Sequence, residues 1–231
     1  MSGRRATVVL VHGIMHGAWC WERVTTLLEC RGIDTIAVDR RRGDPKRVIS
    51  GLRENAELIE AVLDQVDGPV VLVGHSAGCR MITETGLHPS VRHLVYIAGL
   101  MPGPPDDPLT PPQRLPQPSV QLPDGSWAVE PEDAKSRFFT ELDDATASWA
   151  AAQLSPQAPP FPDPADNPTV FAWQERPSTY VMCAKDATVD PGLQREIAPR
   201  ASASIVLESG HSPFLSHPVV LADLLESLAA G

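Results

Sequence analysis

The sequence is short of cationic side chains and of long apolar runs, and both shortages exclude classes of partner. Lysine and arginine together number 19 against 29 aspartate and glutamate residues, so the formal net charge is -10. Nucleic acids and anionic membranes bind basic faces, so we expect neither as a partner and favour a small molecule. No apolar run approaches the roughly 18 residues that span a bilayer. We therefore expect a soluble protein, cytoplasmic by default.

Cysteine is also scarce, and its spacing argues against two further classes of site. The four cysteines, Cys20, Cys30, Cys79 and Cys183, are far apart and form no CxxC pair. This spacing disfavours a zinc site, and a chain of 231 residues does not need a disulfide framework to fold. We expect four buried free thiols, no metal and no organic cofactor.

Short aliphatic runs alternate with amphipathic stretches through most of the chain. This alternation is typical of strand–helix units that build a parallel sheet with helices on both faces. We predict an α/β fold: a three-layer, doubly wound, mostly parallel sheet of six strands, whose core comprises residues 1–100 and 176–231. The predicted strands cover residues 6–12, 33–39, 69–74, 91–98, 177–184 and 203–208.

A proline-rich segment, residues 101–175, interrupts this alternation after the fourth predicted strand. Residues 101–168 contain 16 of the 24 prolines. Because proline fixes φ and has no backbone N–H, the segment cannot form interior sheet. We predict an inserted cap, or lid, with a hairpin at its Asp-Gly turn followed by one or two helices, while the chain remains a single domain overall.

The stretch VVLVGHSAGCRMI places Ser76 in a GxSxG motif between a predicted strand and a predicted helix. A serine on such a turn adopts strained backbone angles, and Gly74 and Gly78 remove Cβ atoms that would collide with the neighbouring helix and strand. The turn directs the hydroxyl beyond the carboxyl edge of the sheet, where open α/β sheets bind ligands. A serine that only caps its helix is the alternative, but the strand before it and the helix after it favour a nucleophile.

A serine hydroxyl is a weak nucleophile unless a base removes its proton, so the motif requires a histidine and an acid elsewhere in the chain. His211 follows the last predicted strand and Asp186 follows the strand before it. The chain order Ser76, Asp186, His211 is the one that this motif requires. Asp190 is a rival acid, but it precedes Pro191, where a helix N-cap is expected, so we favour Asp186.

Hydrolysis of an acyl group also needs two backbone donors for the developing oxyanion. One is the N–H of Ala77, directly after the nucleophile. The other is expected in the glycine-containing loop LVHGIMHGAW after the first strand, with Ile14 as the donor and Gly13 allowing close approach of the backbone.

Four segments together resemble the α/β-hydrolase superfamily: HGIMHGAWCW, VGHSAG, SGHSPFLSHP and STYVMCAKDATVDPGLQ. The branch that they most resemble contains small plant methylesterases, hydroxynitrile lyases and bacterial esterase relatives. The resemblance implies a cap over the nucleophile, Ser76, Asp186 and His211 as a catalytic triad, and main-chain donors at Ile14 and Ala77.

Two departures from that branch disfavour lyase chemistry. Its lyases carry a lysine directly after the histidine and a hydroxyl residue at the position of Gly13, whereas this chain has Ser212 and Gly13. We therefore expect a serine hydrolase of carboxylic esters with small to medium apolar or aromatic groups, acting through an acyl-enzyme on Ser76. The alternatives are a lyase or secondary-metabolite tailoring enzyme using the same triad, and a ligand-binding receptor with slow residual hydrolysis. The oligomeric state is left open as monomer or homodimer.

Side chains around the predicted pocket leave further alternatives open. His12 and His16 either touch substrate or position the loop backbone. Arg40, Arg41 and Arg42 either attract an anionic substrate or form a solvated loop. The substrate-binding residues predicted are Gly13, His16, Phe138, Phe139, Trp149 and Phe161.

Overall fold

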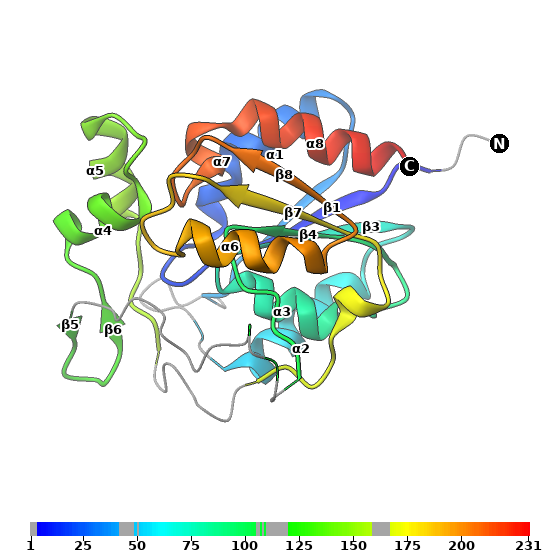
Figure 1. Ribbon diagram of the computed structural model, residues 1–231, viewed down its shortest axis with the longest axis horizontal. Coiled ribbons are helices and arrows are strands. Elements are labelled where there is room, and N and C mark those ends of the chain that lie inside the picture. The colour runs from blue at the N-terminus through cyan, green and yellow to red at the C-terminus, as the bar shows by residue number, and fades with distance from the viewer. Residues whose placement is uncertain are drawn as a thin grey trace.

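The computed structural model describes residues 4–41, 49, 51–104, 107, 109, 120–158 and 167–231. A six-stranded sheet forms its centre, in the order β2-β1-β3-β4-β7-β8, and every neighbouring pair is parallel (Figure 1). The predicted α/β class and all six predicted strands are confirmed. The strands are β1 (Thr7–Val11), β2 (Thr35–Val38), β3 (Val70–His75), β4 (Val91–Ile97), β7 (Ser178–Cys183) and β8 (Ala203–Leu207).

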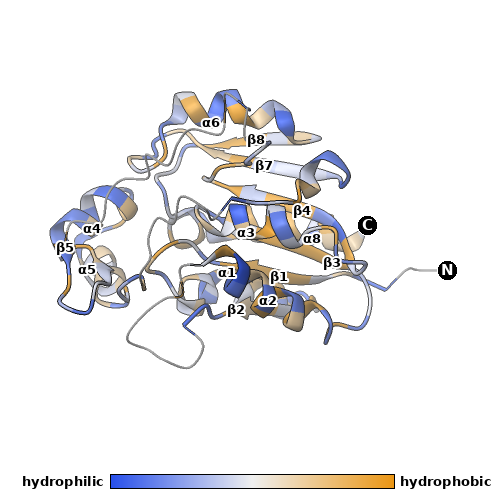
Figure 2. Cartoon of the chain, turned by 90° about the horizontal axis from the view of Figure 1, so that it is seen from below, coloured by the Kyte–Doolittle hydropathy of each residue, from blue (hydrophilic) through white to orange (hydrophobic). Residues whose placement is uncertain are grey.

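Helices cover both faces of this sheet. One face carries α1 (Glu22–Cys30) and α8 (Pro218–Ala230), and the other carries α2 (Leu52–Leu63), α3 (Gly78–Thr85) and α6 (Pro191–Ile197) (Figure 1). Along β1, β3, β4 and β7, alternate side chains enter different apolar clusters: Val8 of β1 packs on the first face and Val9 on the second. Burial on both faces explains why central strands such as β1 and β3 are nearly continuous apolar runs, whereas the edge strand β8 is largely exposed. Hydrophilic residues recur along the helices (Figure 2).

Within residues 101–175, a hairpin and two α-helices lie at the end of the sheet toward which the strands point (Figure 1). A short 3-10 helix, η2 (Ala172–Gln174), precedes β7. The hairpin pairs β5 (Val120–Gln121) with β6 (Trp127–Ala128), and α4 (Pro131–Phe138) and α5 (Asp144–Ala152) follow. The Ser155 N–H donates to the Met15 carbonyl (2.8 Å), which joins this segment to the loop after β1.

The expectation of four buried thiols is wrong for one cysteine. Cys20, Cys79 and Cys183 are buried, but Cys30 is exposed. Leu28 occupies the buried face of α1, and a residue two positions later lies about 200° further round the helix, toward solvent. Within the described ranges, no helix combines the length and the apolar character that crossing a membrane would require.

Candidate active site

Ser76 lies in a tight turn between β3 and α3, with a φ of 51° that side-chain-bearing residues rarely adopt. A Cβ on Gly74 would lie 2.7 Å from the Gly78 carbonyl oxygen, and a Cβ on Gly78 would lie 2.5 Å from the Val11 oxygen. Both glycines are therefore required by close backbone approach, as expected. They allow α3 to start directly against β1 and β3.

His211 and Asp186 meet at the same edge of the sheet, in the loops after β8 and β7. The Nδ1 atom of His211 lies 2.8 Å from Oδ2 of Asp186, and both residues are buried. The ionised carboxylate can only accept, so Nδ1 carries the proton and donates it. This leaves the lone pair of the imidazole on Nε2, the nitrogen that a general base uses.

Three further donors fix the Asp186 carboxylate. Its Oδ1 accepts from the backbone N–H groups of Thr188 (2.7 Å) and Val189 (3.0 Å). Its Oδ2 also accepts from the Gln194 side-chain amide, at 2.9 Å. Gln194 was not foreseen, because no sequence motif marks a glutamine on the following helix as a partner of the acid.

Asp190, the rival acid, has a different partner. It is the N-cap of α6, and its Oδ1 accepts from the backbone N–H of Leu193 at 2.9 Å. The cap satisfies one of the unpaired N–H groups that begin every helix. The structure thus pairs Asp186, and not Asp190, with His211.

His75, the residue between Gly74 and Ser76, connects the nucleophile turn to the histidine loop. Its Nε2 donates to the backbone carbonyl of His211 (2.8 Å), and the two rings are 4.7 Å apart between centroids. Burial holds the pKa of His75 well below its ordinary value, so the ring is neutral. The GxSxG motif leaves the identity of this residue open, so the sequence does not indicate its contact with the histidine loop.

The loop after β1 lies directly against the nucleophile turn. A Cβ on Gly13 would lie 3.0 Å from the Ser76 Cβ, so a larger residue would press on the serine. Ile14 and His16 form a three-residue turn: the His16 N–H donates to the Ile14 carbonyl (2.7 Å) and Met15 has a φ of 59°. Over the described ranges, no acceptor is recorded for the N–H of Ile14 or of Ala77.

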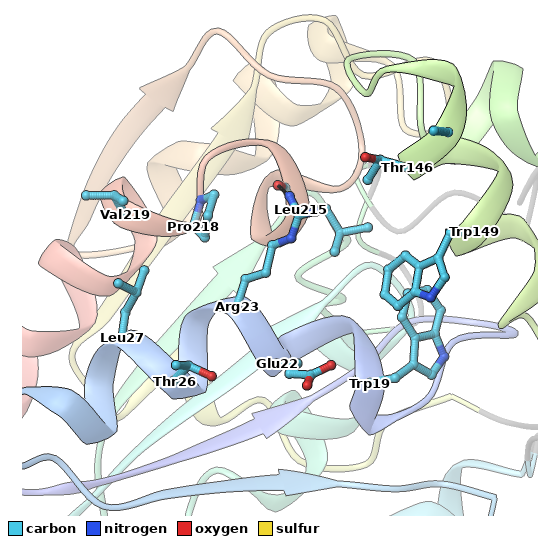
Figure 3. Close-up of a pocket in the computed structure, with 11 residues that line it drawn as sticks. Trp19, Glu22, Arg23, Thr26, Leu27, Thr146, Trp149, Leu215, Pro218 and Val219 are labelled. Carbon is cyan, nitrogen blue, oxygen red and sulfur yellow. Dashed lines mark hydrogen bonds between the residues drawn. The ribbon is translucent and has the colours of Figure 1, made fainter.

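The predicted pocket residues fall into two groups. His16, Phe138 and Phe139 are buried together, and the Phe138 ring lies 5.8 Å from that of His211. Trp149 is 42% exposed and packs edge-on against Trp19. It lines a surface groove of about 820 Å³ between α1, α5 and the start of α8 (Figure 3).

Phe161 lies outside the described residues, as does Arg42. Neither interpretation of the arginine loop fits Arg40, which is only 1% exposed and donates hydrogen bonds to backbone carbonyls inside the protein. Because those carbonyls belong to the loop after β1, far from Arg40 in the sequence, the sequence pattern could not reveal its burial. Arg41 is partly buried and forms a bidentate pair with Asp39, in which Nε donates to Oδ1 at 2.8 Å and Nη2 donates to Oδ2 at 2.5 Å.

His12 and His16 both contact the loop backbone. His12 Nε2 accepts from the Arg40 backbone N–H (3.1 Å), so its Nδ1 carries the proton and donates to the Gly13 carbonyl (2.9 Å). His16 Nδ1 donates to the Ile14 carbonyl at 2.7 Å. Burial lowers the pKa of both, that of His16 to about 4.

Comparison with known proteins shows which proteins this chain is similar to. The chain is 27% identical to the pFDCC methylesterase MES16 of Arabidopsis thaliana, over 92% of this chain and 90% of that protein. It is 25% identical to methyl jasmonate esterase 1 of Vitis vinifera, over 99% and 98% of the two chains. Among solved structures, a pyrethroid hydrolase from Sphingobium faniae JZ-2 superposes with a TM-score of 0.75, at 21% identity over 97% of each chain, and shares the fold. A model of the alpha/beta hydrolase family matches residues 8–224, nearly the whole chain, and this protein therefore belongs to that family.

Proposed function

We propose that this protein is a serine hydrolase that cleaves carboxylic esters. The observation that carries the proposal is the hydrogen bond between His211 and Asp186, buried at the edge of the sheet where the strained turn presents Ser76. The names of the relatives support the reaction class, since MES16 and the Vitis enzyme are both called esterases.

In the proposed mechanism Ser76 Oγ attacks the ester carbonyl while His211 Nε2 takes its proton. The carbonyl oxygen becomes an oxyanion, which accepts from the N–H groups of Ile14 and Ala77. The imidazolium then protonates the leaving alcohol, and Asp186 stabilises the charged ring. Water, deprotonated by the same imidazole, releases the acid from the acyl-enzyme and regenerates Ser76.

The proposed substrates carry small to medium apolar or aromatic groups. Phe138 lies beside His211, and Phe139 and His16 pack against it, so the wall next to the base is aromatic and largely uncharged. Methyl esters are the first compounds to test, because both relatives are named for methyl ester cleavage or a methyl ester substrate.

Residues 101–175 are proposed to form the cap over this site. The described hairpin and helices lie at the sheet edge that presents Ser76, and Phe138 of α4 reaches the His211 ring. Closure by such a segment would exclude water and strengthen the hydrogen bonds to the oxyanion. The proposed location is the cytoplasm, and the proposed assembly is a monomer or homodimer.

Replacement of the nucleophile tests the proposal. Ser76→Ala should lower kcat for 4-nitrophenyl acetate by about 10⁶-fold, because the triad acts as a unit. A fluorophosphonate probe should label the wild-type protein at Ser76 and leave the variant unlabelled, and mass spectrometry of the products should find acid and alcohol. Retention of more than about a tenth of the activity in a folded Ser76→Ala variant would falsify the nucleophile assignment.

A further inference from the structure

A buried guanidinium holds the loop that follows β1. Arg40 Nη1 donates to the carbonyl oxygens of His12 (2.9 Å) and Gly13 (3.0 Å). Its Nε donates to Oδ1 of Asn55 on α2, at 2.7 Å, and its Nη2 donates to the carbonyl of Ile49, at 3.0 Å. The planar fork of arginine suits this task, because it presents several donors in fixed directions to acceptors from separate segments.

The Gly13 carbonyl is held by a second donor as well. The backbone N–H of Arg40 donates to His12 Nε2, which fixes the proton of that ring on Nδ1. Nδ1 then donates to the same Gly13 oxygen, at 2.9 Å. Arg40 therefore acts on this carbonyl twice, directly through its side chain and indirectly through the tautomer of His12.

The orientation of one peptide unit links this carbonyl to the reaction. The C=O of Gly13 and the N–H of Ile14 belong to the same planar trans peptide, so they point in opposite directions. Gly13 lies between Arg40 on its carbonyl side and Ser76, whose Cβ is 3.0 Å from where a Gly13 Cβ would stand. Arg40 and His12 both donate to the Gly13 carbonyl and hold it on their side of the peptide. The Ile14 N–H is therefore directed away from them, toward the nucleophile turn.

We propose that Arg40 is a positioning residue that orients the Ile14 N–H for the oxyanion. The inference rests on the proposed function for the role of that N–H, and adds a residue that touches neither substrate nor triad. A cation on the carbonyl side of the peptide also polarises it, which strengthens the N–H as a donor on the opposite side. Burial of a charged side chain costs free energy unless its hydrogen-bond donors have acceptors. Two of the acceptors of Arg40 are carbonyls of the loop beside the nucleophile.

Steady-state kinetics on 4-nitrophenyl acetate, an uncharged ester, test the inference. Arg40→Met should lower kcat by about 10- to 100-fold, part of the loss that removal of an oxyanion donor causes, with KM changed less than about threefold. Arg40→Lys keeps a buried cation near the two carbonyls and should recover part of that loss. Arg41→Met is the matched control, because Arg41 pairs with Asp39 and makes no recorded hydrogen bond to the loop after β1. It removes the same charge one position away and should change kcat less than about twofold.

The crystal structure of Arg40→Met provides a second readout, in which the Gly13–Ile14 peptide should have turned. A folded variant with a kcat within threefold of wild type, or with that peptide unmoved, overturns the inference. If Arg40→Met does not fold, Arg40→Gln, whose shorter amide cannot span both carbonyls, is judged by the same criteria. If the wild-type protein neither turns over the ester nor labels at Ser76, the proposed function fails, and the orientation of the peptide alone then decides the role of Arg40.

Discussion

At the residue scale, two aspartates four positions apart have different hydrogen-bond partners. The carboxylate of Asp186 accepts four hydrogen bonds and orients His211, whereas the carboxylate of Asp190 caps α6. The same chemical change at the two positions should therefore have unequal consequences.

Asp186→Asn should lower kcat for 4-nitrophenyl acetate by about 10⁴-fold, because an amide in place of the carboxylate favours the wrong imidazole tautomer. Asp190→Asn should leave kcat within about twofold of wild type, since asparagine caps helices as well as aspartate does. Both variants should remain folded by circular dichroism. Equal losses in the two variants, or a larger loss at Asp190, would reject Asp186 as the orienting acid.

Sequence reasoning located the proposed triad more readily than the groups that support it. Ser76, Asp186 and His211 follow strands in a fixed chain order, so motif and order are enough to find them. Arg40 and Gln194 are held by contacts that depend on tertiary packing, and an arginine in a charged run is ordinarily solvated. Burial of a charged residue therefore could not be predicted from its neighbours in the sequence.

At the element scale, the central strands were predictable because both of their faces are buried, so that β1 and β3 are almost entirely apolar. The edge strand β8 is largely exposed and was predicted from its short aliphatic run. The predicted and observed strands differ at their ends by at most two residues. The four-residue helix α7 (Pro213–Ser216) was missed, because an element of one turn carries no helical periodicity. The turn at Ser76 was predicted correctly, since its two glycines mark the close approach of α3 to β1 and β3.

The contact at Gly78 makes a prediction about stability. Gly78→Ala places a Cβ 2.5 Å from the Val11 oxygen and 2.9 Å from the His12 oxygen, so β1 and α3 must separate. We expect the free energy of unfolding to fall by about 2 kcal/mol, as for other overpacked sites. Gly51→Ala is the control, because its Cβ would meet nothing closer than 4.0 Å, and it should cost less than about 1 kcal/mol. Urea denaturation measures both, and equal midpoints and slopes for the two variants would contradict the argument.

On the scale of the whole molecule, the sequence did not predict how the inserted helices lie against the core. Four aromatic residues of the insertion, Phe138, Phe139, Trp149 and Phe161, were predicted to bind substrate, but the pattern could not separate buried side chains from those at the surface. Phe138 and Phe139 lie in the buried cluster near His211, while Trp149 faces the groove that it shares with Trp19, Leu27 and Val219 (Figure 3). The buried residues of α5 are Ala147 and Ala150, which leaves Trp149 on the more exposed side of that helix. The function of the insertion as a cap stays a prediction.

Three buried histidines around the proposed site couple the stability of the whole fold to pH. Burial lowers the pKa values of His12, His16 and His75 below 6.5, and that of His16 falls to about 4. Below pH 6.5 the unfolded chain thus binds protons that the folded chain does not, and the free energy of unfolding falls as the pH is lowered toward 4. Each histidine contributes a slope of at most about 1.4 kcal/mol per pH unit.

Urea unfolding between pH 7 and about 4.5 should show that the free energy of unfolding decreases as the pH falls. In His16→Phe, this free energy should change less steeply with pH, by the contribution of one histidine. Phenylalanine fits the surrounding aromatic rings, although it loses the hydrogen bond to the Ile14 carbonyl, so the slope and not the absolute stability is the relevant readout. An unfolding free energy that stays constant or rises as the pH falls through this window would show that these rings are protonated in the folded protein. His12 would then be charged, and its Nε2 could no longer accept from the Arg40 N–H in the way that the orientation of the Gly13 carbonyl requires.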